Sequence, residues 1–385
     1  MKRLVLVMIA VGSFAFAQVA QAQWTPAKRL TWTSGHSSFP TIARDLTGTL
    51  HVLWVDETPG NGEIYHKTST DGGATWTPNQ RLTWNSGNSG WPVMTADSSN
   101  NIHVLWEDDT PGKGEIFHKK STDLGDTWLA SQNLSSTPGD SWNAAIALDF
   151  SFSAKLHAFW NDNTPGNHEI YYKRSTDGGD TWTTSQRLTW TPGGSWSPEI
   201  AVDYSNNIHV VWFEYTAGNA EIYYKKSTDG GVTWTASQRL TWTSGFSFEP
   251  AIAADSSGNI HVVWYDNSPG NNEIYYRRSP DKGTTWGSLR KLTWTAGESC
   301  YPEIAVDSSG DIHLVWWDNT PGNAEIYYKK STDRGASWTS SQRLTSTSGD
   351  SYSPFIAVDP FGGLHVVWHD DTPGNFEIYY KKFSK

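Results

Sequence analysis

Seven tryptophans recur at an almost constant spacing along this chain of 385 residues, which shows that one structural unit is repeated. Each ends a short motif of the type His-Val-Val-Trp, and successive copies lie 52 residues apart, with one interval of 54. The seven are Trp54, Trp106, Trp160, Trp212, Trp264, Trp316 and Trp368. A period of this length predicts a repeat architecture, in which copies of one supersecondary unit pack side by side.

Each copy contains four segments of strand-forming residues separated by turn formers. In the first copy these segments are 39–45, 50–55, 63–67 and 75–84, and the sequences DLTG, ETPGNG and STDGG separate them. No segment has the 3.6-residue period of an amphipathic helix. Four-stranded antiparallel sheets repeated around a ring form a β-propeller. The predicted fold is therefore all-β, a seven-bladed β-propeller.

The two ends of the chain supply the two parts of one blade. Residues 23–33 read as a fourth strand without the three that precede it, and the chain ends after a third strand that begins at Glu377. We expect the N-terminal strand to pair with the C-terminal blade, because this pairing closes the ring and removes its free edges. Residues 23–385 are predicted to form this single domain.

Tryptophan is the most conspicuous component of the repeat. Nineteen of the 23 tryptophans occupy three repeated positions: the end of the second strand and the two ends of the fourth. A large flat ring suits the layer between two blades, where both faces of a sheet are buried. We therefore predict that tryptophan is mainly core material here.

The first residues predict export rather than folding. Lys2 and Arg3 precede an apolar run over 4–17, and Ala20-Gln21-Ala22 has the small-x-small pattern of a signal-peptide cleavage site. Residues 1–22 are thus predicted to be a signal peptide, and the mature protein to be periplasmic or extracellular, without a membrane span. Loss of the two basic residues takes the formal charge from −11 to −13, which argues against nucleic acid as a partner.

A second motif, Ser-x-Asp-x-Gly-x-Thr-Trp, follows the third strand in six copies. Its first copy is Ser69 to Trp76, and the last has Ser337 in place of threonine. The motif resembles the Asp-box, or BNR repeat, of the sialidase superfamily. That resemblance implies a structural hairpin between the third and fourth strands, away from the catalytic face. The aspartates in question are Asp71, Asp123, Asp177, Asp229, Asp281 and Asp333.

The residues that carry sialidase chemistry are not evident in this sequence. Sialidases have an Arg-Ile-Pro motif, three arginines that bind the substrate carboxylate, an acid/base aspartate and a tyrosine nucleophile activated by a glutamate. This chain has no Arg-Ile-Pro, and only Arg44 stands at a position where the other copies have no arginine or lysine. One such arginine cannot form the triad, so the resemblance extends to the fold and not to the chemistry.

Two repeated sets of polar residues have the composition of a metal or catalytic site. Seven histidines share one position of the second strand, and seven glutamates that begin the third strand face an acidic residue across the turn. Ligands for one metal must converge on it, which seven separate blades cannot arrange, so we interpret the histidines as a repeated polar contact inside each blade interface and predict no metal. We interpret the carboxylates as turn caps. In the fourth copy, Glu214 beside Tyr215 is the alternative candidate for a catalytic couple.

The loops that lead into the first strand of each copy supply the candidate ligand site. Each contains an aromatic residue near a proline, beside Ser, Asn and Asp, on the face that the turns TPGN share. Aromatic platforms next to polar groups suit pyranose sugars, and wedging of neighbouring blades is the competing interpretation. The residues are Phe39, Trp91, Trp142, Trp196, Phe248, Tyr301 and Tyr352; Glu199 and Glu303 are further candidates that point into the channel.

These observations leave three hypotheses for function. The first is an exported carbohydrate- or glycoconjugate-binding propeller without catalysis or cofactor, whose near-identical copies favour multivalent binding. The second is a sialidase-like glycoside hydrolase with an unrecognised catalytic carboxylate pair. The third is a protein-interaction scaffold of the cell envelope, because propellers host many functions.

Overall fold

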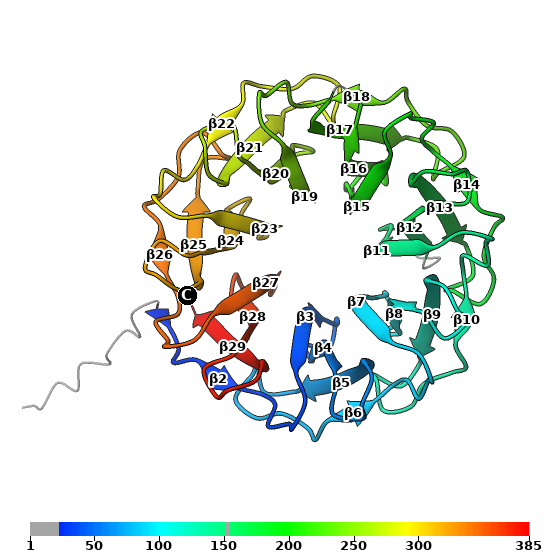
Figure 1. The fold of residues 1–385 in the computed structure, drawn as a ribbon, viewed down its shortest axis with the longest axis vertical. Helices are drawn as coiled ribbons and strands as arrows, with labels where there is room; N and C mark the ends of the chain where they lie inside the picture. Colours follow the sequence, from blue (N-terminus) through cyan, green and yellow to red (C-terminus); the bar gives the residue numbers. More distant parts are fainter. Residues whose placement is uncertain (1–22, 151–154, 217, 385) are drawn as a thin grey trace, which may run out of the picture.

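The computed structural model describes residues 23–150, 155–216 and 218–384, and within them the chain forms a closed ring of seven four-stranded antiparallel sheets (Figure 1). The predicted signal peptide, residues 1–22, lies outside the described residues. The innermost strands are β3 (Ser37–Arg44), β7 (Ser89–Ala96), β11 (Ser141–Leu148), β15 (Ser195–Val202), β19 (Ser247–Ala254), β23 (Ser299–Val306) and β27 (Ser351–Val358). The second strands are β4 (Leu50–Asp56), β8 (Ile102–Asp108), β12 (Leu156–Asp162), β16 (Ile208–Tyr215), β20 (Ile260–Asp266), β24 (Ile312–Asp318) and β28 (Leu364–Asp370).

The outer half of each blade is built from one long and one very short strand. The third strands are β5 (Glu63–Ser69), β9 (Glu115–Ser121), β13 (Glu169–Ser175), β17 (Ala220–Ser227), β21 (Glu273–Ser279), β25 (Glu325–Ser331) and β29 (Glu377–Ser384). The fourth strands are β6 (Gln80–Arg81), β10 (Gln132–Asn133), β14 (Gln186–Arg187), β18 (Gln238–Arg239), β22 (Arg290–Lys291) and β26 (Gln342–Arg343), and in the last blade β1 (Gln23–Trp24) with β2 (Lys28–Arg29).

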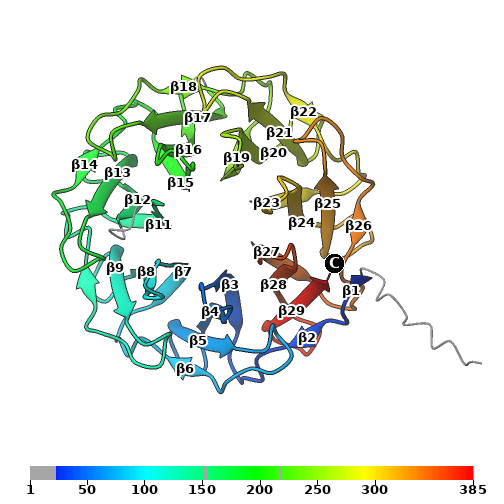
Figure 2. The ribbon, with the colours of Figure 1, turned by 180° about the vertical axis from the view of Figure 1, so that it is seen from behind.

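The ring closes between the two ends of the chain, as the sequence predicts. Both β1 and β2 pair antiparallel with β29, and Figures 1 and 2 show the three strands side by side from opposite sides. The amide of Leu30 donates to the carbonyl of Ile378 at 2.7 Å, and the Arg29 guanidinium forms an ion pair with Glu377. The outer edge of β29 is therefore paired, and the seventh blade has the same four layers as the other six.

The second strands form the core of the ring because both of their faces are covered by neighbouring blades. Every residue of β4 is buried, and Trp54 has no exposed surface. The six corresponding tryptophans are exposed by at most 2%. This double burial explains why these strands read as nearly continuous apolar and aromatic runs.

The fourth strands are shorter than the sequence predicts. In the first blade a strand was expected over 75–84, but only Gln80–Arg81 pairs with β5. The amides of Thr77 and Leu82 still donate to Thr68 and Ile64, at 2.9 and 2.7 Å. Residues 75–84 thus bond to β5 at three points only. The Asp-box turn occupies the residues with which a longer fourth strand would begin.

One of the three repeated tryptophan positions does not belong to the core. The tryptophans that close the fourth strand are 65–71% exposed, which corrects the expectation that nearly all repeated tryptophans are buried. Each lies on the outer rim with a cationic side chain over its ring, as Arg81 lies 5.7 Å from the ring centre of Trp84. Their exposure follows from the two-residue length of the fourth strand, beyond which the chain leaves the sheet. They are Trp32, Trp84, Trp190, Trp242 and Trp294.

The Asp-boxes lie at one face of the ring and connect neighbouring blades. Asp71 accepts hydrogen bonds from the amide of Thr75 and the hydroxyl of Ser69, both at 2.8 Å. The ring of Trp76 packs edge-on against Tyr380 of the preceding blade, with 5.2 Å between ring centres. In strand register Ser37 lies opposite Asp56, which lies opposite Glu63, so the starts of the innermost strands are at the other face.

The seven repeated histidines of the second strands form hydrogen bonds to the third strand of their own blade. In blades three to seven the partner is a tyrosine hydroxyl of the third strand, as for His209 and Tyr224 at 2.7 Å. In the first two blades it is a second histidine, as for His51 and His66 at 3.1 Å. All seven are at most 2% exposed.

Candidate functional site

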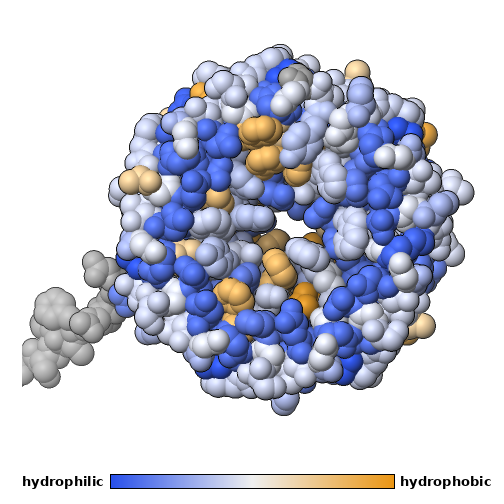
Figure 3. Space-filling model, viewed as in Figure 1, coloured by the Kyte–Doolittle hydropathy of each residue, from blue (hydrophilic) through white to orange (hydrophobic). Residues whose placement is uncertain are grey.

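A central cavity of about 700 Å³ opens where the seven innermost strands begin, on the face opposite the Asp-boxes. In Figure 3 apolar side chains surround the central opening, while polar ones cover most of the surrounding face. The lining comes from all seven innermost strands, with Trp317, His369 and Phe376 from the second and third layers.

A β-bulge near the start of each innermost strand shapes the cavity wall. Register shifts between Ser38 and Thr41 in the first blade, and the skipped residue Phe39 has a φ of +50°. The same shift and the same left-handed backbone occur in all seven blades, and bulges of this kind redirect side chains next to binding sites. The residues with positive φ are Phe39, Trp91, Asn143, Ser197, Glu249, Tyr301 and Ser353.

The bulge divides the seven predicted aromatic residues into two groups. Phe39, Trp91 and Tyr301 occupy the bulge itself, are 36–48% exposed and line the cavity. The other four come one residue earlier, and in a strand a shift of one residue sends the side chain to the opposite side. Those four are Trp142, Trp196, Phe248 and Tyr352.

The four aromatic residues of the earlier position pack against the preceding blade. The ring centre of Trp196 lies 3.6 Å from that of His168, and Phe248 packs edge-on against Phe213 at 5.2 Å. Tyr352 packs against Trp317 at 5.2 Å and also reaches the cavity wall. These four residues thus pack between neighbouring blades, while the three bulge residues line the cavity.

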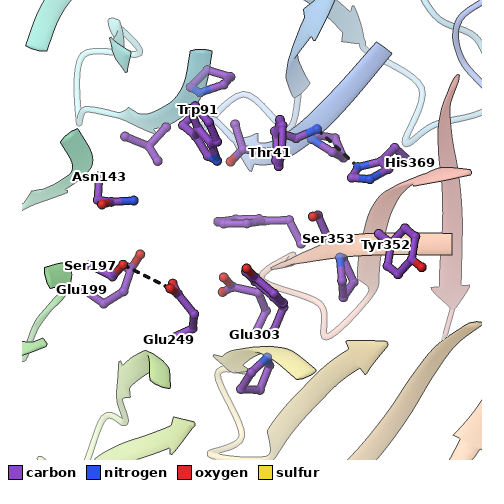
Figure 4. A pocket seen from close by; sticks show the side chains of 18 of the residues that line it. Thr41, Trp91, Asn143, Ser197, Glu199, Glu249, Glu303, Tyr352, Ser353 and His369 are labelled. Atoms are coloured by element: carbon purple, nitrogen blue, oxygen red, sulfur yellow. Dashed lines mark hydrogen bonds between the residues drawn. The ribbon is translucent and has the colours of Figure 1, made fainter. Parts of the chain in front are cut away.

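Three glutamates from consecutive blades face the cavity together. Glu199 and Glu303 come two residues after the bulge in blades four and six, and Glu249 occupies the bulge of blade five. Figure 4 shows the three carboxyl groups gathered on one side, with Trp91 and Thr41 on the opposite side. The hydroxyl of Ser197 donates to Glu249 at 3.3 Å. The sequence indicates Glu199 and Glu303 but not Glu249, although a glutamate at a position where the other blades have aromatic, serine or asparagine residues is a signal that could have found it.

The environment of these carboxyl groups favours their protonated forms. Burial raises the pKa of Glu249 to about 7. Burial and the neighbouring Glu249 raise the pKa of Glu199, and burial together with both other glutamates raises that of Glu303. Burial lowers the pKa of His369 to about 3, so this imidazole is neutral at physiological pH. The lining includes no lysine or arginine among the described residues.

Side chains from the second strands hold the bulges by accepting their amide hydrogens. The imidazole of His369 accepts from the amide of Phe39 at 3.3 Å, and Asn161 accepts from Ser197 at 3.3 Å. Glu107 accepts from the amide of Asn143. Its second carboxyl oxygen has no partner among the described residues, and burial raises the pKa of Glu107 to about 8.

Glu214 and Tyr215 lie outside the cavity lining. The Glu214 carboxyl accepts from Trp212 at 3.1 Å and from Ser195 at 3.4 Å, the same bonds that Asp108 makes in the second blade. Tyr215 is 38% exposed, and its ring packs edge-on against Phe213 at 5.9 Å.

The repeated carboxylate pairs organise the loops of the cavity face. Asp56 accepts from Ser37 at 3.0 Å and from the amide of Thr58 at 2.9 Å, while Glu63 accepts from Arg81 and from the amide of Asn85. These bonds recur in other blades and fix the turns around the cavity. Within the described ranges there is no group of three or more His, Cys, Asp and Glu residues arranged to hold a metal ion.

Seven blades with Asp-box hairpins on one face and a cavity on the other define a seven-bladed Asp-box β-propeller. The profile of the BNR repeat-like domain family matches residues 155–357, more than half of the chain, and the chain belongs to this family. Within the described ranges no helix has the length and apolar character needed to cross a membrane.

Two relatives found by sequence comparison are named as xyloglucanases. The chain is 27% identical to xyloglucanase Xgh74A of Acetivibrio thermocellus over 59% of its own length and 29% of the relative's. It is 25% identical to the xyloglucanase of Hypocrea jecorina over 68% and 31%. The chain thus spans less than a third of the length of these relatives.

Solved structures share the fold at low sequence identity. An ulvan lyase, a polysaccharide lyase, is similar with 12% identity and a TM-score of 0.65, covering 92% of this chain and 95% of that one. The NanB sialidase of Streptococcus pneumoniae is similar with 14% identity and a TM-score of 0.52, covering 92% and 70%. At this identity the likeness concerns the fold.

Proposed function

We propose that this protein is an exported carbohydrate- or glycoconjugate-binding propeller whose central cavity holds the glycan. The aromatic platform in the cavity carries the proposal: Phe39 and Trp91 stand 4.9 Å apart between ring centres, and Tyr301 adds a third ring. Such rings stack on the C–H face of a pyranose, and polar groups beside them bind the hydroxyls. A volume of about 700 Å³ is within the range of small-molecule sites.

The proposed site is non-catalytic with respect to sialosides. Sialidases bind the substrate carboxylate with three arginines, and the described cavity lining has none. The curated relatives named as xyloglucanases support a polysaccharide ligand in general. Export follows from the predicted signal peptide.

A glycan array with the purified protein, together with a sialoside hydrolysis assay, tests the proposal. We expect saturable glycan binding that weakens about tenfold or more in Trp91→Ala and Tyr301→Ala, because each substitution removes a stacking platform. Trp294→Ala is the matched control, because Trp294 is 71% exposed on the outer rim, outside the cavity. Binding that survives the loss of both cavity rings would place the ligand elsewhere.

A glycoside hydrolase is the second candidate, favoured by the three carboxyl groups with raised pKa. A protonated glutamate beside an ionisable one is the arrangement that acid-assisted glycoside cleavage requires. Turnover of a glycoside that disappears in Glu199→Gln or Glu249→Gln would support this function. Turnover lost instead in Glu214→Gln or Tyr215→Phe would assign it to that couple. Absence of both binding and turnover would favour a protein-interaction scaffold.

A further inference from the structure

We infer that the central cavity selects a positively charged glycan, an amino sugar that carries a free ammonium group. This inference rests on the proposed glycan-binding function and names the chemistry of its ligand. The juxtaposition that carries it is a cavity with an aromatic wall on one side and three carboxyl groups on the other (Figure 4).

The ionisable side chains that face the cavity are acidic, apart from one imidazole. Glu199, Glu249 and Glu303 are its acidic groups, and the described lining contains no lysine or arginine to neutralise them. The one imidazole in the wall, that of His369, is neutral because burial lowers its pKa. An anionic sugar would meet repulsion here and no charged donor, so the site discriminates against it.

The carboxyl groups also retain hydrogen-bonding capacity for a ligand. Glu249 accepts one bond from the Ser197 hydroxyl at 3.3 Å. Among the described residues no side chain donates to the carboxyl group of Glu303. An ammonium group has three donors and no acceptor, and three carboxyl groups on consecutive blades can receive all three.

Burial and mutual repulsion explain why a cation would bind better than a neutral group. Burial raises the pKa values of all three glutamates, and repulsion from neighbouring carboxylates also raises those of Glu199 and Glu303, because each effect makes the ionised form unfavourable. An ammonium group beside them supplies the missing countercharge and relieves both. A neutral acetamide in the same place supplies one donor and leaves the repulsion intact.

The opposite wall accommodates the rest of such a sugar. Trp91 lies on the side away from the carboxyl groups, and the ring centre of Phe39 is 4.9 Å from that of Trp91. A pyranose is about as wide as an aromatic ring, so it can stack there while its amino substituent points across the cavity. The two walls therefore bind two different parts of one residue.

Calorimetry with two matched oligosaccharides tests the inference: a β-1,4-linked glucosamine tetrasaccharide with free amines, and the same tetrasaccharide fully N-acetylated. We expect the free-amine form to bind at least about tenfold tighter at pH 6, because it alone carries the ammonium groups. Glu303→Gln and Glu199→Gln should each remove most of this preference. Glu57→Gln is the control, because Glu57 is an exposed carboxylate of the same face outside the cavity lining.

The outcomes separate this inference from the function on which it rests. Equal binding of both tetrasaccharides, or tighter binding of the N-acetylated one, would overturn the charge selection and leave glycan binding in place. Binding of neither, with other glycans retained on the array, would also overturn it alone. Absence of binding to the array and to both tetrasaccharides would contradict the proposed glycan-binding function as well. Thermal melting of each variant excludes unfolding as the cause of a loss.

Discussion

In two blades the repeated histidine of the second strand bonds to a second histidine, and in the other five it bonds to a tyrosine. This difference makes the stability of the first two blades depend on pH. Burial lowers the pKa of His66 and of His118 to about 3. In the unfolded chain a histidine titrates near 6.5. The stabilising contribution of each neutral imidazole is thus present above pH 6.5 and is lost as the pH falls toward 3.

We predict that His66→Tyr and His118→Tyr stabilise the protein in acid by about 2 kcal/mol each at pH 5, relative to their effect at pH 8. Tyrosine makes the corresponding bond in the other blades, as Tyr172 does to His157 at 2.8 Å. Urea unfolding at the two pH values measures the effect. The reverse change, Tyr224→His, should lower acid stability; an unchanged pH profile in all three variants would contradict the account.

Ionisation of Glu107 is predicted to make the protein less stable as the pH rises, the opposite of the effect of His66 and His118. Its folded pKa of about 8 lies above the unfolded value, so its contribution is best in acid and declines as the pH rises toward 8. Glu107→Gln keeps an acceptor for the amide of Asn143 and should remove roughly 2–3 kcal/mol of this decline between pH 5 and 8. Asn161, at the equivalent position of blade three, shows that an amide serves there. Urea unfolding across this range, with Asn161→Asp as the converse variant, measures it.

At the scale of the element, the Asp-box hairpin connects one blade to the next. Gly231 has a φ of +83°, and a Cβ added there would lie 1.9 Å from the Tyr172 hydroxyl of the preceding blade. The glycine is therefore required by packing between blades as well as by backbone conformation. The sequence motif predicts only the backbone requirement, because the neighbouring ring is 59 residues away in the chain.

A pair of alanine substitutions separates the two requirements. Gly230 also has a positive φ, +70°, but a Cβ there would come no closer than 3.9 Å to its nearest neighbour, Arg174. We expect Gly230→Ala to cost about 1 kcal/mol and Gly231→Ala at least about 2–3 kcal/mol. Thermal melting provides the measurement. Equal losses would show that backbone strain alone explains the conserved spacing within the box.

The repeat predicted the elements better than it predicted which side chains reach the cavity. The spacing of turn formers located the three long strands of the first blade to within two residues. The bulge was not evident, so Trp91 and Trp196 seemed equivalent although one faces the cavity and the other packs between blades. Glu249 was missed because its side chain enters the cavity only through the bulge. Such placement depends on a register shift, which periodicity does not encode.

At the scale of the whole molecule, the N-terminal segment closes the ring by pairing with the last strand of the chain. Leu30 and Leu82 occupy equivalent sites, each 2% exposed and each bonded through its amide at 2.7 Å. The segment that contains Leu82 follows β5 of its own blade through the Asp-box hairpin, whereas the segment that contains Leu30 packs against β29 from the opposite end of the chain.

We predict that Leu30→Ala and Leu82→Ala both lose about 2–4 kcal/mol of stability through the cavity that each creates. Only Leu30→Ala should accelerate hydrogen exchange in β29, because it weakens the pairing that closes the ring. Exchange measured by mass spectrometry over residues 377–384 tests this difference. The same exchange rate in both variants would mean that closure does not depend on this strand.

Because β1 and β2 complete the last blade, the two ends of the ring meet within one blade and not between two blades. The amide of Thr25 already bonds to the carbonyl of Lys382 at 2.8 Å, so a short linker could join the two ends. A circular permutant that begins at a turn of another blade would then keep every strand pair of the ring. Such permutants would place a fusion partner at any chosen blade while leaving the cavity in the centre unchanged.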